Sequence, residues 1–272
     1  MTGQGDNGRV PPPAVVPEVV AQGPPLPTLQ IMSQWWRDIC FAHWAVDPAR
    51  VAPMLPRGVR PDLHEGQAWV GLIPFRMVDA GVFSGPAIPW LGAFLEMNVR
   101  TYTIDDQGRR GVFFCSLEAQ RLAVVAGALG LFNVPYRWAH MTYAAGSLAD
   151  GRRTHGYTSR RLGPAVGGGA GRVRGSAAGS RMRVAVGPAL EHPTERDLFL
   201  TARFGLHTSL LGQPLWIPNT HGPWPLHSAE LLDLEDTLLA AAGFPDLAAT
   251  PPQSVLCSPG VRTVFGFPQR VP

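Results

Sequence analysis

Short apolar segments separated by turn residues dominate the chain after position 30. Residues 37–46 are rich in apolar and aromatic side chains and have the length of a strand. Residues 67–76 form a second apolar segment, in which Pro74 predicts a bulge or a sheet edge because proline cannot donate to a strand ladder. The pattern therefore predicts β-structure from the start of the ordered chain.

The clearest single element is a hairpin. Residues 96–104 alternate between polar and apolar side chains, and the turn residues 105–108 lead into the apolar segment 111–118. Alternation with period two is typical of a strand that has two different environments on its two faces. Further strands are predicted over 136–143, 154–160, 182–186, 228–234 and 254–267.

Helices are predicted to be few and short. Asp47 before Pro48 is a typical start, and Thr194 with Asp197 resembles a capping box. The predicted helices span 48–55, 119–131, 198–203 and a short segment that ends at residue 242. The glycine-rich residues 163–179 and the proline- and tryptophan-rich residues 214–225 are expected to be connections.

These elements predict the fold class. Eight to ten strands occur without the β–α–β alternation that a parallel sheet requires. We therefore expect a mainly β (α+β) protein, an antiparallel β-barrel-like double sheet with a central cavity and a few short helices. Residues 30–272 should form this single domain, whereas residues 1–29, with seven prolines and four glycines, are expected to be a disordered tail.

Composition excludes one chemistry outright. The chain has 23 basic residues and all are arginine, so no lysine can form a Schiff base with a carbonyl substrate. The three cysteines are widely spaced and predict no disulfide framework. We expect neither a signal peptide nor an apolar run long enough to span a membrane, and hence a cytoplasmic protein.

Charge and motifs favour a small-molecule ligand over other partners. The net charge is only +3, and the arginine-rich stretch 152–183 contains one aromatic residue, Tyr157, so we expect no nucleic acid partner and no membrane partner. The sequence lacks the usual nucleotide-binding and hydrolase motifs, and His207, His221 and His227 have no metal-ligand spacing. We expect no metal and no cofactor. The sequence does not decide whether the chain forms a homo-oligomer.

Several motifs carry a family resemblance. The stretches WRDICFAHWAVDPARVAPMLPRGV (36–59), AWVGLIPFRM (68–77), FLEMNVRTYT (94–103) and GVFFCSLEAQ (111–120) with LGLFNVPYRWAHM (129–141) resemble the YqjF-like family of uncharacterised proteins. That family lies within the acetoacetate decarboxylase-like superfamily. The resemblance extends through GYTSR (156–160), LFLTARFGLHT (198–208) and HGPWPLHSAEL (221–231), and it implies the same double sheet with a central cavity.

The resemblance also implies site residues. The decarboxylase arginine near the first strand is similar to Arg37, and the glutamate of the central strand is similar to Glu96. The catalytic lysine pair falls on Tyr136 and Arg137, and a second acidic residue falls near Ile73 and is missing. The absence of lysine from the whole sequence, independently of this alignment, excludes decarboxylation through a lysine iminium ion.

Two functions remain open. In the first, an enzyme without covalent catalysis uses Glu96 and Tyr136 in enolisation, hydration, dehydration or cyclisation of a small organic acid or polyketide-like metabolite. In the second, the same cavity belongs to a non-catalytic binding or sensing module. The candidate substrate-binding residues are Arg37, Arg100, Arg137 and Arg203.

Each candidate also has a structural alternative. Arg37 and Glu96 would then be a buried ion pair, Tyr136 a core residue with its hydroxyl on a backbone carbonyl, and Arg100 and Arg203 ordinary salt-bridge partners.

Overall fold

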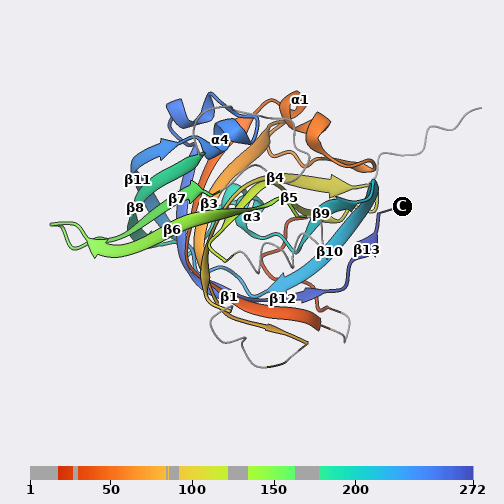
Figure 1. Ribbon diagram of the computed structural model, residues 1–272, viewed down its shortest axis with the longest axis horizontal. Helices are drawn as coiled ribbons and strands as arrows, with labels where there is room; N and C mark the ends of the chain where they lie inside the picture. The colour runs from red at the N-terminus through yellow and green to blue at the C-terminus, as the bar shows by residue number, and fades with distance from the viewer. Residues whose placement is uncertain are drawn as a thin grey trace, which may run out of the picture.

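The computed structural model describes residues 18–26, 30–83, 85, 92–121, 134–162 and 178–271, and this part of the chain is built mainly from β-strands (Figure 1). The strands are β1 (Gln30–Val46), β2 (Val59–Pro61), β3 (Ala68–Val82), β4 (Phe94–Asp105), β5 (Arg110–Ala119), β6 (Tyr136–Ser147), β7 (Arg153–Arg161), β8 (Gly179–Ala189), β9 (Gly205–Leu210), β10 (Gln213–His221), β11 (His227–Asp236), β12 (Ser254–Gly266) and β13 (Gln269–Arg270). The helices are α1 (Pro48–Val51), α3 (Glu195–Thr201) and α4 (Leu238–Ala241), with 3₁₀ turns at Ala52–Met54 and Leu247–Ala249.

The described strands form one sheet that wraps around and closes on itself twice. Strand β12 pairs with β1, β10 and β11, and strand β5 pairs with β4, β6 and β9. A large ring therefore runs through β12–β1–β3–β4–β5–β6–β7–β8–β11, and a small ring through β12–β1–β3–β4–β5–β9–β10. The pairings of β5 with β6 and β9 are parallel, and the other described pairings are antiparallel. The predicted wrapped and mainly antiparallel double sheet with few helices is confirmed.

Each ring has its own packed interior, and β4 contributes to both. Met97 and Val99 belong to a core with Trp44 and Tyr157 on the large-ring side. Tyr102, on the opposite face of β4, packs with the small-ring residues Phe199 and Ile217. The pleat of a strand shared by two rings thus sends successive side chains into two different interiors.

A bulge in β1 decides which of its residues face the small ring. Between Arg37 and Ala42 the register of β1 against β3 shifts by one residue, and Asp38 has a positive φ of 51°. Trp36 packs on the small-ring side before the bulge, and Phe41 packs there after it. One extra residue reverses the alternation. This bulge lies opposite Pro74, where the sequence predicted a bulge or an edge.

The helix starts confirm the sequence analysis. The Asp47 side chain accepts a hydrogen bond from the Ala49 amide at the start of α1. Thr194 and Asp197 form the reciprocal capping box of α3.

The prediction that residues 214–225 form a connection was wrong for most of that segment. Residues Gln213–His221 are strand β10, which pairs with β9 in a hairpin. The turn consists of Leu211 and Gly212, both with positive φ (51° and 80°), the conformation that tight hairpins need. Pro214 and Pro218 lack an amide proton but keep their places opposite β9.

The structure also differs from the predicted element boundaries near the N-terminus. Residues 18–26, expected to be disordered, lie against the sheet, where the Gly23 amide donates to the carbonyl of His221 (3.2 Å) and Val19 packs with the Phe199 core. Strand β1 begins seven residues earlier than predicted, at Gln30. Most of the predicted helix 119–131 and loop 163–179 lie outside the described residues, although Ala119 ends β5 and Gly179 begins β8.

Two simple findings complete the fold. Cys40, Cys115 and Cys257 are all free thiols. Within the described residues, no helix has both the length and the apolar character needed to cross a membrane.

Candidate functional site

Glu96 is a buried carboxyl group that has no cationic partner among the described residues. It lies on β4 with only 3% of its surface exposed, and the Tyr136 hydroxyl on β6 donates a hydrogen bond to its Oε2 (2.9 Å). Burial raises the pKa of Glu96 to about 7, although hydrogen bonds from Tyr136 and Asn98 oppose that rise. Burial and the neighbouring Glu96 raise the pKa of Tyr136, so its hydroxyl keeps its proton and remains a donor.

The small ring surrounds this pair with aromatic rings. Phe75 is paired with Glu96 across the β3–β4 ladder, and its ring lies 5.7 Å from that of Trp36. Trp36 in turn stacks on Trp224, 6.0 Å away, and His221 lies 5.1 Å from Trp224. This apolar wall is the reason that the carboxyl group is poorly solvated.

Further polar side chains share the Glu96 face of β4. Asn98 and Arg100 follow at alternate positions and are 3% and 7% exposed. Arg100 Nη2 donates to the Leu200 carbonyl (3.1 Å) and to the Tyr102 hydroxyl (3.3 Å). We name Glu96, Asn98, Arg100 and Tyr136 the interior cluster.

Tyr102 determines the state of His43. The Tyr102 hydroxyl donates its proton to the Leu200 carbonyl (2.7 Å). His43 Nε2 lies 2.6 Å from the Tyr102 hydroxyl oxygen and must therefore donate a hydrogen bond to that oxygen. Burial and the nearby Arg100 lower the pKa of His43, which keeps its ring neutral. His43 Nδ1 is then a hydrogen-bond acceptor facing the interior.

Several buried polar atoms around the interior cluster have no hydrogen-bond partner among the described residues. They are Asn98 Oδ1, Arg100 Nε, His43 Nδ1, Trp36 Nε1 and His221 Nε2. Buried polar groups in proteins are nearly always satisfied by protein, water or ligand. The set contains both hydrogen-bond acceptors and donors, so a small polar molecule could form hydrogen bonds with them.

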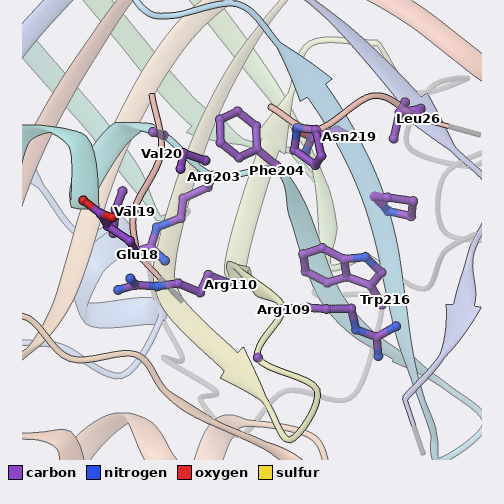
Figure 2. A pocket seen from close by; sticks show the side chains of 14 residues that line it. Glu18, Val19, Val20, Leu26, Arg109, Arg110, Arg203, Phe204, Trp216 and Asn219 are labelled. Atoms are coloured by element: carbon purple, nitrogen blue, oxygen red, sulfur yellow. The ribbon is translucent and has the colours of Figure 1, made fainter. Parts of the chain in front are cut away.

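Arg203 lies at a different place, beside a pocket of about 370 Å³ (Figure 2). Its guanidinium group is 5.0 Å from the centre of the Tyr102 ring and forms an ion pair with Asp62. Arg100 Nη2 donates to the Tyr102 hydroxyl, and the Arg100 guanidinium group is 5.5 Å from the centre of the same ring, so both arginines contact Tyr102. A second cavity of about 300 Å³ is lined in part by Trp224. Neither of these two cavities is lined by Glu96 or Tyr136.

Arg137 points away from Tyr136, because successive residues of a strand face opposite sides. It lies opposite Glu118 in the β5–β6 pairing. Burial and the nearby Arg161 lower its pKa, whereas Glu118 acts in the opposite direction. Glu118 itself is held by Arg161, whose Nη2 lies 2.7 Å from Oε1. The structure thus places Arg137 beside a second buried carboxylate.

Arg37 lies on the face of β1 opposite to Trp36. Its guanidinium group stacks on the ring of Trp35, 4.1 Å from the ring centre. No salt bridge joins Arg37 and Glu96 among the described residues, and the only hydrogen-bonding side chains assigned to Glu96 there are those of Tyr136 and Asn98. The bulge at Asp38 explains this placement, since without it Arg37 would share a face with Phe41.

Each of the three histidines considered as metal ligands in the sequence analysis has a hydrogen-bond partner at Nδ1. His207 Nδ1 is 2.9 Å from the Thr103 hydroxyl, His221 Nδ1 is 2.7 Å from the Gly222 carbonyl, and His227 Nδ1 is 3.1 Å from the Gly187 carbonyl. Among the residues that the structure describes, no group of three or more metal-ligating side chains gathers.

Sequence analysis missed Asn98, His43 and Tyr102. Asn98 could have been found, because it follows Glu96 by two residues in an alternating strand. His43 and Tyr102 are 59 residues apart and carry no local signal.

Comparisons with known proteins agree with this architecture. The profile of the DUF2071 family of uncharacterised conserved proteins matches residues 33–262. The uncharacterised protein YqjF of Bacillus subtilis (strain 168) is 31% identical over 215 residues, which cover 79% of this chain and 82% of YqjF.

Solved structures share the fold at low sequence identity. An acetoacetate decarboxylase-like enzyme from Sphingomonas wittichii RW1 superposes with a TM-score of 0.59 and 15% identity, covering 89% of this chain and 93% of that one. Acetoacetate decarboxylase from Legionella pneumophila gives 0.57 and 15%, covering 92% of each chain. The enduracididine biosynthesis enzyme MppR, complexed with the condensation product of pyruvate and imidazole 4-carboxaldehyde, gives 0.56 and 14%, covering 91% and 90%. The chain therefore belongs to the DUF2071 family, as a YqjF-like protein with the acetoacetate decarboxylase-like fold.

Proposed function

We propose that the interior cluster binds a small organic acid or polyketide-like metabolite and that Glu96 exchanges a proton with it. The observation that carries the proposal is a carboxyl group, 3% exposed, whose pKa is raised to about 7 and which has neutral hydrogen-bond partners. A group with a pKa near the working pH is the best compromise between donating and accepting a proton. MppR, which shares the fold, has been crystallised with a pyruvate-derived product.

The neighbours of Glu96 suit this role. Tyr136 donates to Oε2 and so orients the carboxyl group. Asn98 Oδ1 and Arg100 Nε, on the same face of β4, have no partner among the described residues and can receive a hydroxyl and a carboxylate or enolate oxygen, respectively. These parts are sufficient for enolisation, hydration or dehydration, and cyclisation, which need no covalent intermediate.

The proposal excludes an imine intermediate. No lysine exists in the chain, so the side chains offer no amine to a carbonyl carbon. Borohydride treatment in the presence of acetoacetate should leave the mass of the protein unchanged, apart from reaction at the N-terminal amine. An adduct that maps to the interior cluster would contradict the proposal.

The decisive experiment measures affinity against pH. An anion beside Glu96 binds more tightly when the carboxyl group is protonated, so the affinity for acetoacetate or pyruvate should fall as the pH rises through about 7. Glu96→Gln should retain binding and lose this pH dependence. The exposed Glu191→Gln is the matched control and should behave like the wild type.

Two results would contradict the proposal. One is an affinity for these acids that is independent of pH between about pH 6 and pH 8 in the wild type. The other is the same pH profile in Glu96→Gln. Exchange of the acid's α-hydrogens with solvent, followed by NMR, separates catalysis from a sensing role: exchange that Glu96→Gln abolishes assigns an enzyme, and binding without exchange assigns a binding module.

A further inference from the structure

The pocket beneath residues 18–26 is separate from the interior cluster. Its volume is about 370 Å³, within the range of small-molecule sites. Residues 18–26 contribute part of the lining, and the rest comes from the start of β5, the segment after α3 and β10 (Figure 2). Glu96, Asn98, Arg100 and Tyr136 do not line it, and the Tyr102 ring contacts Arg203 as well as Arg100.

Three arginines line the pocket, and fixed carboxylates hold them in place. Asp62 accepts hydrogen bonds from Arg110 Nε (2.7 Å) and Nη2 (3.0 Å) and also pairs with Arg203. Asp105 accepts from Arg109 Nε (2.6 Å). Burial alone would raise the pKa of Asp105, but hydrogen bonds from His207 and Arg109 outweigh it and lower the pKa to about 2. Arginines anchored in this way are rigid donors.

Donor atoms of this group remain unused. Arg203 Nη2 and Arg109 Nη2 are buried and have no hydrogen-bond partner among the described residues. Arg203 is only 4% exposed, so water does not surround its free nitrogen. Burial lowers the pKa of Arg203 to about 10, which leaves the group charged at neutral pH. A buried unpaired guanidinium nitrogen is costly, and an anionic acceptor would remove that cost.

Acidic groups around the pocket are of two kinds. The three guanidinium groups share two buried carboxylates, Asp62 and Asp105. Among the described residues that line the pocket, Glu18 is the only acidic one, and it is exposed. Figure 2 shows Glu18 on the same side of the pocket as Arg110 and Arg203. Glu18 therefore brings a negative charge to the side of the pocket that carries these two arginines.

The rest of the lining is apolar. Trp216 packs closely against Gly111 and Gly205, where a Cβ at either glycine would overlap its ring. Phe204 and Val20 form further walls. A ring-shaped apolar body thus has a surface to pack against beside the cationic side.

We propose that this pocket is a second ligand site, which binds a small anion with an apolar ring. The anionic group contacts Arg203, and the ring packs against Phe204 and Trp216. This site is independent of the interior cluster and of the acid–base role of Glu96.

Titration calorimetry with three compounds tests the chemistry. Naphthalene-2-carboxylate should bind about tenfold more tightly than the neutral naphthalene-2-carboxamide, which is the scale of one charge contact. Inorganic phosphate should bind more weakly than the carboxylate, because it lacks the ring. Equal affinities for the carboxylate and the amide, or for phosphate and the carboxylate, would overturn the proposal.

Substitutions at the exposed wall locate the site without disturbing the buried arginines. Val20 is 53% exposed, and Val20→Glu should weaken binding of the carboxylate about tenfold, whereas Val20→Gln should change it little. Glu18→Gln should strengthen binding about threefold, because it removes the one acidic side chain among the described lining residues. Glu235→Gln, on the distant strand β11, is the matched control and should have no effect.

The outcome also separates this site from the interior cluster. Glu96→Gln and Tyr136→Phe should leave naphthalene-2-carboxylate binding unchanged. If Glu96→Gln alters that affinity and the Glu18 and Val20 variants do not, the compound binds in the interior cluster, and the second site is disproved. A failure of acetoacetate to bind in a pH-dependent manner would affect the proposed function alone.

Discussion

Glu96 and Glu118 are buried glutamates on neighbouring strands with opposite electrostatic surroundings. Glu96 on β4 faces the small ring and is 3% exposed, while Glu118 on β5 is 1% exposed and pairs with Met97, whose side chain faces the large ring. Arg161 donates to both oxygens of Glu118 at 2.7–3.1 Å. Glu96 receives the neutral hydroxyl of Tyr136 instead.

The difference shows how equal burial leads to different chemistry. A buried carboxylate needs a cation to stay charged, and Glu118 has one. Glu96 has none at hydrogen-bond distance among the described residues, so its pKa rises to about 7. The partner, rather than the depth of burial, makes Glu96 the candidate for proton transfer and Glu118 a structural ion pair.

The largest effect is expected from breaking the Glu118 pair. Arg161→Met removes the arginine that donates to both oxygens of the buried Glu118 and should cost about 4 kcal/mol in the free energy of unfolding. The double variant Arg161→Met/Glu118→Gln should recover much of that loss, as a urea midpoint series would show. Arg181→Met, at an exposed pair with Glu235, should leave the midpoint unchanged. A small loss in Arg161→Met would show that Glu118 is not held by this pair.

Glu96→Gln, in contrast, should increase the free energy of unfolding above about pH 7. The folded protein keeps the Glu96 proton up to about pH 7, whereas the unfolded chain loses it near 4.5, so stability falls as the pH rises between these values. At about pH 8 Glu96→Gln should be more stable than the wild type by about 3 kcal/mol, and at about pH 4 the two should be equal. Urea midpoints at both pH values measure this. A variant that is less stable than the wild type at the higher pH would mean that Glu96 is held as an anion.

Tyr136→Phe should have a smaller effect. Loss of the hydroxyl removes one hydrogen bond to Glu96 and should cost about 1 kcal/mol. Because that bond lowers the pKa of Glu96, its removal should move the Glu96 titration to higher pH. Carboxyl-carbon NMR of Glu96 across the titration measures the shift. An unchanged titration would show that Tyr136 does not orient the carboxyl group.

Arg37→Met is expected to have the smallest effect. Arg37 stacks on Trp35 on the opposite face from Trp36, and loss of that contact should cost about 0.5 kcal/mol. The Glu96 titration should stay as in the wild type. A shift of that titration would support the Arg37–Glu96 ion pair that the sequence analysis considered.

The hydrophobic pattern alone determined much of the architecture. The alternation over residues 96–104 predicted β4 and its hairpin with β5, and the Thr194–Asp197 motif predicted the start of α3, because both depend on neighbours within a few residues. The absence of lysine excluded a Schiff base without any structure. Composition and local periodicity are complete in the sequence.

Only the tertiary structure decided which of the predicted residues meet. The bulge at Asp38 turned Arg37 away from Phe41, and the pleat of β6 sent Arg137 toward Glu118 while Tyr136 reached Glu96. A one-residue shift reverses every later side chain of a strand, and the sequence of β1 itself does not mark it, although Pro74 on the neighbouring strand predicted an irregularity. The pKa of Glu96 likewise depends on strands that are distant in the chain, because burial and partners exist only once the sheet has closed.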